Sequence, residues 1–211
     1  MRPGAQASGT RATPDSILPR DFYARPTLTV ARDLIGARLV HLANGRRLAG
    51  IILETEGYIG EQDLGCHAKA GRTKRTAVMY GPPGHAYVYF TYGNHWMLNV
   101  VTEREGFPAA VLIRAVQPVD GIRGIARRRN HRDTHGPGKL TQGLGITGMH
   151  NGLDLTIGQS KLWIEADRHV PNSLVTRGPR VGLNTVPEPW KSKPWRFLVK
   201  GWNLETGEQR I

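Results

Sequence analysis

The sequence predicts an α+β fold, a single mixed domain in which short helices surround a central, curved and mostly antiparallel β-sheet. Many short β-branched or aromatic segments alternate with glycine-rich turns, whereas helical periodicity is confined to a few short stretches. Such a pattern is typical of a sheet that is mainly antiparallel. The 211 residues suit one domain with a full core. No stretch of about 18 apolar residues is present, so we expect no membrane span.

The first elements expected are a helix and two strands. Thr27 is the predicted N-cap of a short helix whose Val30 and Leu34 face inward. Apolar residues near Leu39 then lead into a strand. Residues 46–60, RRLAGIILETEGYIG, alternate in polarity and are rich in β-branched side chains, so we expect a second strand there.

A long polar segment and three strands follow. Residues 61–84 are rich in glycine, lysine and arginine and predict a long loop, a kind of segment that often carries function. Residues 85–101 predict two strands joined by a turn at Gly93 and Asn94. Residues 109–116 predict a further strand.

The second half of the chain is expected to contain basic, glycine-rich and strand segments. Residues 121–135 form a basic segment without a predicted element. Residues 136–146, GPGKLTQGLGI, predict a glycine loop that opens a short helix. Residues 153–165 and 177–200 predict further strands.

The first 16 residues differ in composition from the rest. Residues 1–16 contain proline, glycine, serine and threonine without an apolar core, so we expect a disordered basic tail rather than a secretory signal. Residues 17–211 are then the single domain. Cys66 is the only cysteine, which excludes an intrachain disulfide and agrees with a reducing compartment. The short tail without a clear localisation run favours the cytoplasm of a bacterium, in association with the nucleoid, and the nucleus of a eukaryotic cell also fits.

The charge balance is the first guide to a partner. Lys and Arg number 29 against 17 Asp and Glu, a formal net charge of +12 with a pI near 10.4. Such an excess favours a polyanion, most often nucleic acid. Ribosomal proteins, membrane-surface proteins and some lysozymes share it, so charge alone does not identify the function.

Acidic residues cluster in and just after the second predicted strand. Glu54, Glu56, Glu61 and Asp63 fall within ten positions. Glu54, Glu56 and Tyr58 point to one face because side chains alternate along a strand. Two carboxylates in an apolar strand are costly without partners, a cost that catalytic sites often bear. The alternative is structural: one glutamate pairs with an arginine in the core and the other is solvated.

An aromatic cluster lies in and before the predicted hairpin. Tyr87 and Tyr89 share one face of their strand, and Phe90 and Tyr92 share the other. Tyrosines on a basic protein can stack on nucleobases, each contact contributing roughly 1–3 kcal/mol. Tyr92 lies at the hairpin tip, where a bulky side chain is suited to wedge into a base stack. The alternative is that these rings pack the core.

Basic residues supply a surface for phosphate. Arg72, Lys74 and Arg75 lie in the long loop, and five arginines lie between residues 123 and 132. Lys139 stands at the predicted helix start in GPGK, where backbone N–H groups and a lysine suit a phosphate. The sequence has no G-x-S-x-G, H-E-x-x-H or paired C-x-x-C motif. We therefore expect neither a serine hydrolase nor a metal site, and no cofactor.

Taken together, several of these segments resemble the alkyladenine (3-methyladenine, methylpurine) DNA glycosylase family. The resemblance covers residues 19–201. The order of ETE-x-Y, YVY-x-x-YG and LIRA is specific, although no single motif would be. The matching pieces are LETEGYIG at 53–60, His67, YGPPGHAYVYFTYG at 80–93, Asn99, AVLIRAVQP at 110–118, GPGKLTQGLGI at 136–146, and the late RVGLN and KPWRFLVKG segments.

The resemblance implies a catalytic pair. Glu56 would deprotonate or orient the attacking water, and Arg114 would help to hold that water and Glu56. An alkylated purine such as 3-methyladenine is already a cation and a good leaving group, so one carboxylate suffices. The matched pocket motifs contain no lysine, so we expect a monofunctional glycosylase without strand-cleaving lyase activity.

The resemblance also implies a pocket for a flipped base. Tyr58, His67 and Tyr89 would line it, with Tyr58 and Tyr89 stacking on the base. Asn99 would disfavour the exocyclic amino group of normal guanine, and Tyr92 would fill the gap left in the duplex. Stacking between tyrosines favours a cationic ring by about 0.5–2 kcal/mol. Extruding the base is easiest when damage has already weakened its pairing.

The expected function is base-excision DNA repair. A monomer would hydrolyse the N-glycosidic bond of alkylated or deaminated purines in double-stranded DNA and leave an abasic site. Two alternatives remain open. A non-catalytic nucleic-acid binder explains the charge and the tyrosines but not Glu54, Glu56 and Arg114 on central strands. A polysaccharide hydrolase needs its two carboxylates on opposite sides of the bond, whereas Glu54 and Glu56 share one face.

Overall fold

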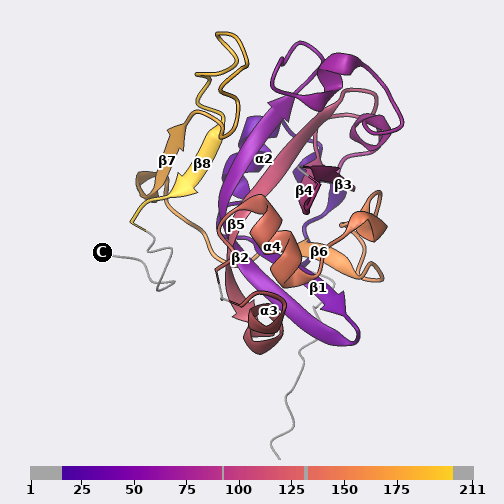
Figure 1. The fold of residues 1–211 in the computed structure, drawn as a ribbon, viewed down its shortest axis with the longest axis vertical. Coiled ribbons are helices and arrows are strands. Elements are labelled where there is room, and N and C mark those ends of the chain that lie inside the picture. Colours follow the sequence, from indigo (N-terminus) through magenta and orange to yellow (C-terminus); the bar gives the residue numbers. More distant parts are fainter. Residues whose placement is uncertain (1–15, 92, 131–132, 202–211) are drawn as a thin grey trace, which may run out of the picture.

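The computed structural model describes residues 16–91, 93–130 and 133–201. Its strands form a sheet in the order β3-β4-β5-β2-β1-β6, and each strand runs antiparallel to its neighbours. A two-stranded extension, β7 and β8, joins this sheet where β8 pairs with β2. Short helices surround the curved sheet (Figure 1), so the predicted α+β fold is confirmed.

The strands vary in length from four residues to 14, and the helices are short. The strands are β1 (Arg38–Ala43), β2 (Arg46–Ile59), β3 (Ala86–Thr91), β4 (His95–Val101), β5 (Ala109–Asp120), β6 (Leu162–Glu165), β7 (Val175–Gly178) and β8 (Arg196–Val199). The α-helices are α1 (Arg20–Tyr23), α2 (Thr27–Asp33), α3 (Ile122–Arg128) and α4 (Pro137–Leu144). Short 3₁₀ helices are η2 (His67–Ala70), η3 (Ala77–Tyr80), η4 (Gly148–His150) and η5 (Asn172–Leu174).

The antiparallel pair of β2 and β5 forms the centre of the molecule. β2 is buried without interruption from Leu48 to Gly57, because helix α2 covers one of its faces. Thr55 Oγ1 donates a hydrogen bond to the carbonyl of Ala31 in α2 at 2.7 Å. Gly57 lies so close to α2 that an added Cβ would come within 2.8 Å of Leu28 Cδ2. These contacts fix the strand that carries the cluster of acidic residues.

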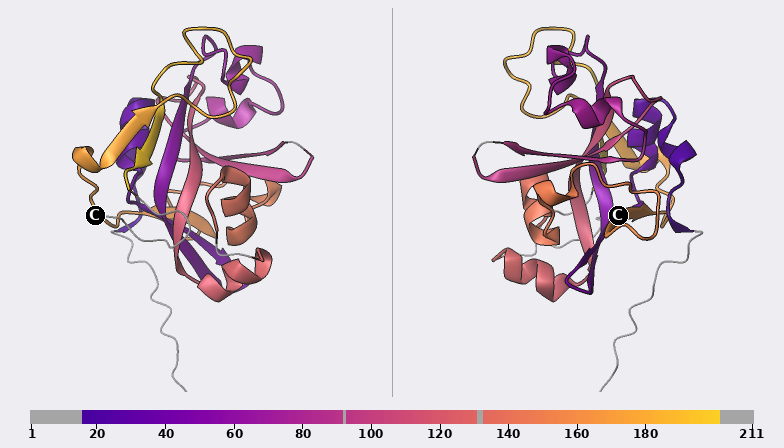
Figure 2. Two further views of the ribbon diagram at one scale, coloured as in Figure 1. Left: turned by 60° about the vertical axis from the view of Figure 1, so that its left-hand side comes forward. Right: turned by 90° about the vertical axis from the view of Figure 1, so that its right-hand side faces the viewer.

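The β3–β4 hairpin projects from the body of the molecule (Figure 2), and α4 lies against it. Thr141 Oγ1 of α4 donates to the carbonyl of Trp96 at 2.8 Å. Gly138, in the first turn of α4, faces His95, where an added Cβ would lie 2.7 Å from a ring carbon. A residue without a side chain at this position therefore lets the start of α4 approach β4. The predicted hairpin and the predicted helix after residue 136 are both confirmed.

The start of α2 differs from the prediction. Its N-cap is Pro26, and no side chain of the local sequence caps the helix. Instead Glu103, on the loop after β4, accepts hydrogen bonds from the backbone N–H and the hydroxyl of Thr27 at 2.7 and 2.8 Å. The predicted N-cap role of Thr27 is therefore wrong, because a carboxylate distant in the sequence satisfies the helix start.

Three later segments also differ. The basic segment contains helix α3, in which Ile125 is fully buried. The strand predicted over 153–165 is reduced to β6, because Asp154 forms a turn by accepting from the N–H of Thr156 at 2.9 Å. The segment predicted as strand over 177–200 contains β7 and β8 only at its ends. A loop without strand periodicity, residues 179–195, joins these two strands.

Some predictions lie outside the described residues. The predicted tail does so apart from Ser16, and so does Tyr92 at the hairpin tip. Within the described ranges, none of the helices has the length and apolar character needed to cross a membrane.

A pair of histidines joins β1 to the end of α4. His41 Nδ1 lies 2.6 Å from the carbonyl of Leu144, and the two Nε2 atoms of His41 and His150 lie 2.9 Å apart. A carbonyl only accepts, so His41 Nδ1 carries a proton and its Nε2 accepts the proton of His150 Nε2. The Thr147 N–H completes the chain by donating to His150 Nδ1 at 3.0 Å. An additional proton would bring two N–H groups against each other.

This histidine pair predicts a loss of stability in mild acid. Burial lowers the pKa of His41 from 6.5, so the unfolded chain takes up a proton there more readily than the folded protein. The contribution is present above pH 6.5 and is lost as the pH falls below that value. We expect the melting temperature of His41→Asn to fall less steeply than that of the wild type between about pH 7 and 5. His169→Asn, on the exposed surface, is the control and should follow the wild type.

Candidate active site

A cavity of about 410 Å³ lies where the β3–β4–β5 part of the sheet meets the loop before η2, the start of α4 and residues 181–183. The four residues predicted to form a base pocket all line it, together with the predicted Arg114 and Lys139. The sequence therefore identified side chains that the fold brings to one place from β2, β3, β4, β5, η2 and α4. The four pocket residues are Tyr58, His67, Tyr89 and Asn99.

Glu56 lies directly behind the wall of this cavity, with a side chain that is 0% exposed. Its Oε1 accepts the N–H of Val181 at 2.7 Å, and its Oε2 accepts the hydroxyl of Tyr58 at 2.8 Å. The guanidinium of Arg114 lies against both oxygens, at 3.3 Å (Nε to Oε1) and 3.4 Å (Nη1 to Oε2). All three partners line the cavity, so the carboxylate is one side chain away from it.

Glu54 has a different environment. It accepts hydrogen bonds from Arg114 Nε at 2.9 Å and Arg196 Nε at 2.6 Å, and it does not line the cavity. The structural alternative is thus correct for Glu54, which pairs with arginines. The same alternative predicted that the other glutamate is solvated, and this is wrong because Glu56 is buried. Both carboxylates contact one arginine, so they do not flank a sugar bond as a glycan hydrolase would require.

The register of β2 and β5 is irregular where Arg114 meets the two carboxylates. Ile52 is opposite Val116, Glu54 is opposite Ala115 and Thr55 is opposite Ile113, so Leu53 on β2 and Arg114 on β5 are both left out of the regular pairing. The sequence predicted both strands but contained no signal for this irregularity.

The environment of Glu56 makes it a stronger base than an ordinary glutamate. Burial raises the pKa of Glu56, while Arg114, the Val181 N–H and the Tyr58 hydroxyl oppose that rise. Burial and the charge of Glu56 also raise the pKa of Tyr58 well above 10, so its hydroxyl remains a donor at neutral pH. A carboxylate with a raised pKa, held by a cation and two donors, is suited to accept a proton from water.

Aromatic rings from η2 and β3 form part of the cavity wall. The His67 ring packs edge-on against Tyr89, with centroids 4.5 Å apart, and His67 Nδ1 lies 3.0 Å from the Tyr87 hydroxyl. Tyr87 is 2% exposed and belongs to a small apolar cluster, so the alternative of core packing holds for it, although it also reaches the cavity wall. Tyr89 is half-buried, which leaves part of its ring available to a ligand.

Two arginines touch these rings without lining the cavity. Arg75 Cζ lies 5.0 Å from the centroid of Tyr89, and Arg180 Cζ lies 4.6 Å from that of Tyr58. Burial lowers the pKa of His67 to about 4, with further contributions from Arg75 and Lys69. The imidazole is therefore neutral at physiological pH.

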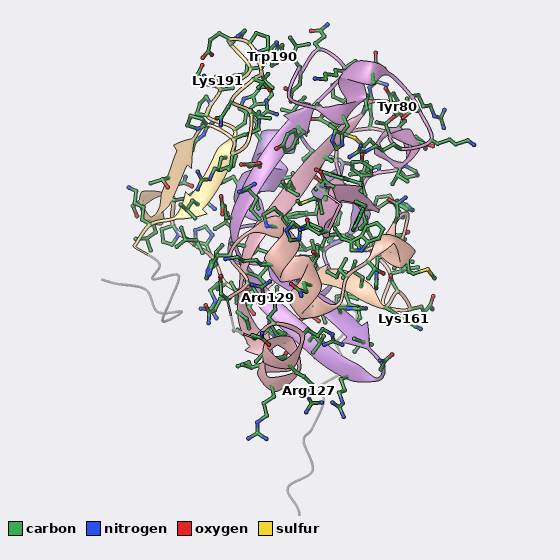
Figure 3. The ribbon with its side chains drawn as sticks, viewed as in Figure 1. Tyr80, Arg127, Arg129, Lys161, Trp190 and Lys191 are labelled. Atoms are coloured by element: carbon green, nitrogen blue, oxygen red, sulfur yellow. The ribbon has the colours of Figure 1, made fainter. Side chains whose placement is uncertain are left out.

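The rim of the cavity is formed by the start of α4 and by β4. Lys139 Nζ binds Asp133 Oδ2 at 2.5 Å, so the predicted phosphate-binding lysine already has one acidic partner. His95 also lines the cavity and was not predicted to do so. A polar residue just after the hairpin turn was the available signal. Of the basic segment, the described arginines Arg123, Arg127, Arg128 and Arg129 do not line the cavity, and Figure 3 shows Arg127 extending from α3 away from the molecule.

Sequence reasoning missed the contribution of the loop between β7 and β8. Val181 acts through its backbone N–H, which no residue type reveals. Arg180 forms a fully buried pair with Asp63, from the predicted acidic cluster, although 117 positions separate them. Among the residues that the structure describes, no group of three or more His, Cys, Asp or Glu side chains could hold a metal ion.

Comparison with known proteins identifies the family of this chain. The sequence model of the methylpurine-DNA glycosylase family matches residues 21–203. A protein of Myxococcus xanthus is 49% identical over 183 residues, covering 87% of this chain and 90% of its own. Proteins of Anaeromyxobacter dehalogenans and Methanocella arvoryzae are 49% and 47% identical, covering 87% of this chain and 84% and 92% of their own. All three are named "Putative 3-methyladenine DNA glycosylase". The chain belongs to the methylpurine-DNA glycosylase family.

Proposed function

We propose that this DNA glycosylase takes a damaged purine out of double-stranded DNA and hydrolyses its bond to the sugar with Glu56 as the base. The family assignment makes the chain an enzyme of base-excision repair that acts on alkylated bases. The proposal adds base flipping, hydrolysis without strand cleavage, deaminated purines as further substrates and action as a monomer. The observation that carries it is the buried Glu56 carboxylate, held by Arg114 at the wall of an aromatic cavity.

The chemistry needs one base and an electrostatic contribution. The oxygen of water attacks C1′ of the sugar, the glycosidic electron pair leaves with the purine nitrogen, and Glu56 accepts the proton that the water loses. As the bond breaks, positive charge develops on the sugar, and a carboxylate nearby stabilises it. Arg114 lines the cavity and touches Glu56, so it can hold the water in line with the carboxylate.

The cavity suits a flipped purine in size and in chemistry. Its volume of about 410 Å³ falls in the range of small-molecule sites. Tyr58 and Tyr89 offer flat apolar faces on which a base can stack. Arg180 lies against the ring of Tyr58 and Arg75 against that of Tyr89. These two positive charges weaken the attraction of the rings for a cationic base. Neutral lesions such as hypoxanthine therefore belong to the proposed range alongside alkylated purines.

The proposed path of the DNA runs from the hairpin to the start of α4. Tyr92, which the sequence predicts at the turn of this hairpin, is proposed to fill the space that the extruded base leaves. Lys139, at the rim of the cavity, is proposed to contact a phosphate next to the flipped nucleotide. We place the enzyme in the bacterial cytoplasm, in association with chromosomal DNA, in keeping with its relatives from Myxococcus and Anaeromyxobacter.

The test of the proposed function is base release from defined duplexes. Each duplex carries one 7-methylguanine, one hypoxanthine or no lesion, and free base and strand breaks are measured separately. We expect release from both lesions, with breaks only after alkali. Trapping of a covalent adduct by borohydride would contradict a monofunctional mechanism. Tight DNA binding without release of either base would identify a binding protein instead of an enzyme.

Asn99 is predicted to exclude normal guanine. Asn99 is 3% exposed and lines the cavity, and its Nδ2 donates to the carbonyl of Tyr87 at 3.1 Å, which fixes the amide. Asn99→Ser creates space for the exocyclic amino group, so we expect release of normal guanine to rise by at least about tenfold. The measurement is competition between undamaged and hypoxanthine duplexes.

Asn151→Ser is the matched control for Asn99→Ser. Asn151 binds the backbone of β3 through Val88 N–H at 2.9 Å, but it does not line the cavity. This variant should keep the base preference of the wild type. An unchanged preference in Asn99→Ser as well would remove Asn99 from its proposed role.

A further inference from the structure

A buried charge pair lies next to the active site but outside the cavity. Arg180 and Asp63 both have side chains that are 0% exposed, and they form two contacts, at 2.5 Å (Nη1 to Oδ2) and 2.8 Å (Nη2 to Oδ1). Neither residue lines the cavity. Burying such a pair is a weak source of stability, because the loss of hydration of both ions offsets their attraction. The pair is therefore better explained by the segments that it holds in place next to the active site.

The pair ties together three segments of the chain. Asp63 accepts the backbone N–H of Ile59, at the end of β2, at 3.2 Å and that of Gly65, in the loop before η2, at 2.9 Å. Arg180 donates to the carbonyl of Gly57 on β2 at 3.1 Å and itself belongs to the loop between β7 and β8. The end of β2, the loop before η2 and the β7–β8 loop are thus joined at one point.

The guanidinium of Arg180 is closely packed between two aromatic rings, a backbone carbonyl and Gly65. Its Cζ lies 4.6 Å from the ring centroid of Tyr58 and 4.9 Å from that of Trp195. Its Nη2 also reaches the carbonyl of Trp190 at 3.3 Å, in the loop at the top of Figure 3. At Gly65, an added Cβ would come within 2.9 Å of Nη2. These contacts fix the position of Arg180 and of the residue that follows it.

The residue that follows is Val181, which holds the catalytic carboxylate. Its backbone N–H donates to Glu56 Oε1 at 2.7 Å. A hydrogen bond to the charged form of a carboxylate lowers its pKa, and here it opposes the rise that burial causes in Glu56. A small displacement of Arg180 would lengthen this bond, because only one peptide separates the two groups.

We propose that Arg180 and Asp63 are positioning residues for catalysis, which hold the Val181 N–H on the Glu56 carboxylate and the ring of Tyr58 at the cavity wall. This inference rests on the proposed role of Glu56 as the base. The pair acts through Val181 and Tyr58 and does not touch the substrate.

A conservative substitution of Arg180 can separate its effect on Glu56 from the effects of the other charged groups around the carboxylate. Arg180→Lys keeps the positive charge but cannot form the two parallel contacts with Asp63 or stack as a flat guanidinium. It leaves in place the other charged groups that face the carboxylate from β2, β5 and, through Glu54, β8, which are Arg114, Glu54 and Arg196. A changed titration of Glu56 then reports on the two contacts that the pair is proposed to hold, those of the Val181 N–H and the Tyr58 hydroxyl.

The experiment measures single-turnover base release from a 7-methylguanine duplex over about pH 5 to 8.5. In Arg180→Lys, we expect the acidic limb of the pH–rate profile to move to higher pH by about one to two units, the size of one hydrogen bond to a charged group. Below the limb the rate should fall about 10- to 100-fold, and above it the rate should approach that of the wild type. The affinity for lesion DNA should not change. Titration of the substrate is common to both proteins and cancels in their ratio.

The control is a second arginine with a two-point contact. Arg47 binds Glu165 at 3.2 and 2.7 Å, and neither residue lines the cavity. Arg47→Lys should leave the limb of the profile in place. If Arg180→Lys lowers the rate equally at every pH, the pair contributes only to folding and the proposal is overturned. If Arg180→Lys does not fold, Trp195→Leu removes one ring from the stack and should move the limb in the same direction, and an unmoved limb there overturns the proposal too.

Failure of this inference is distinct from failure of the proposed function. If Glu56→Gln retains base release, the role of Glu56 as the base is wrong and the positioning role falls with it. If Glu56→Gln loses release while the profiles of Arg180→Lys and Asp63→Asn coincide with the wild type, only the positioning role is wrong.

Discussion

Glu56→Gln is expected to lower base release by at least about 100-fold while the protein still binds lesion DNA. Glutamine preserves the shape of the side chain, and its carbonyl can still accept one of the two hydrogen bonds from Val181 and Tyr58. Arg114 keeps its bond to Glu54, so no buried cation is left alone. The variant lacks only the carboxylate that takes the proton of water. Single-turnover base release, with binding measured on the same duplex, tests this expectation.

The matched control for Glu56→Gln is Glu61→Gln. Glu61 also accepts a tyrosine hydroxyl, that of Tyr80 at 2.6 Å, but it does not line the cavity. Tyr80 is the last residue of η3, and Figure 3 shows it at the edge of the molecule. We expect Glu61→Gln to release bases at the wild-type rate. Full activity in Glu56→Gln would mean that another group, or the charge of the lesion alone, drives the reaction.

The largest expected effect on stability is that of Asp63→Ala. The substitution leaves the guanidinium of Arg180 buried without its carboxylate and removes the acceptor for two backbone N–H groups. Breaking a buried pair from one side costs about 3–5 kcal/mol. For a chain of this length, that corresponds to a fall in melting temperature of about 6–20 °C. Thermal unfolding at neutral pH is the measurement.

An exposed ion pair provides the comparison for Asp63→Ala. Arg25 and Asp33 lie 2.9 Å apart, with side chains 36% and 41% exposed. Such pairs contribute about 0–1 kcal/mol, so Asp33→Ala should change the melting temperature only slightly. Equal shifts for the two variants would show that the buried pair of Asp63 and Arg180 contributes no more to stability than an exposed pair.

The part of the site that the sequence predicted follows from local regularities. Strand alternation placed Glu56 and Tyr58 on one face, and their hydrogen bond confirms it. The turn at Gly93 predicted the hairpin, and the hairpin brings Tyr89 and Asn99 to the same cavity. These features depend on neighbours in the sequence, whose spacing is visible in the chain.

The remaining part depends on contacts between distant segments. The irregular pairing at Arg114 is set by β2 and β5 together, and neither strand alone indicates it. Val181 contributes a backbone group, so its side chain carries no signal. Arg180 and Asp63 are ordinary charged residues until the fold removes both from water. The same reason explains the N-cap of α2, where Glu103 replaces the expected local cap.

A crystal structure of Glu56→Gln bound to a duplex with a single hypoxanthine tests directly whether Glu56 acts on a flipped base. We expect the hypoxanthine to lie out of the stack, between Tyr58 and Tyr89, with C1′ of its sugar facing Arg114 and residue 56. If the hypoxanthine remains paired in the duplex, or binds outside this cavity, the buried carboxylate cannot act on its glycosidic bond and the proposed mechanism is wrong.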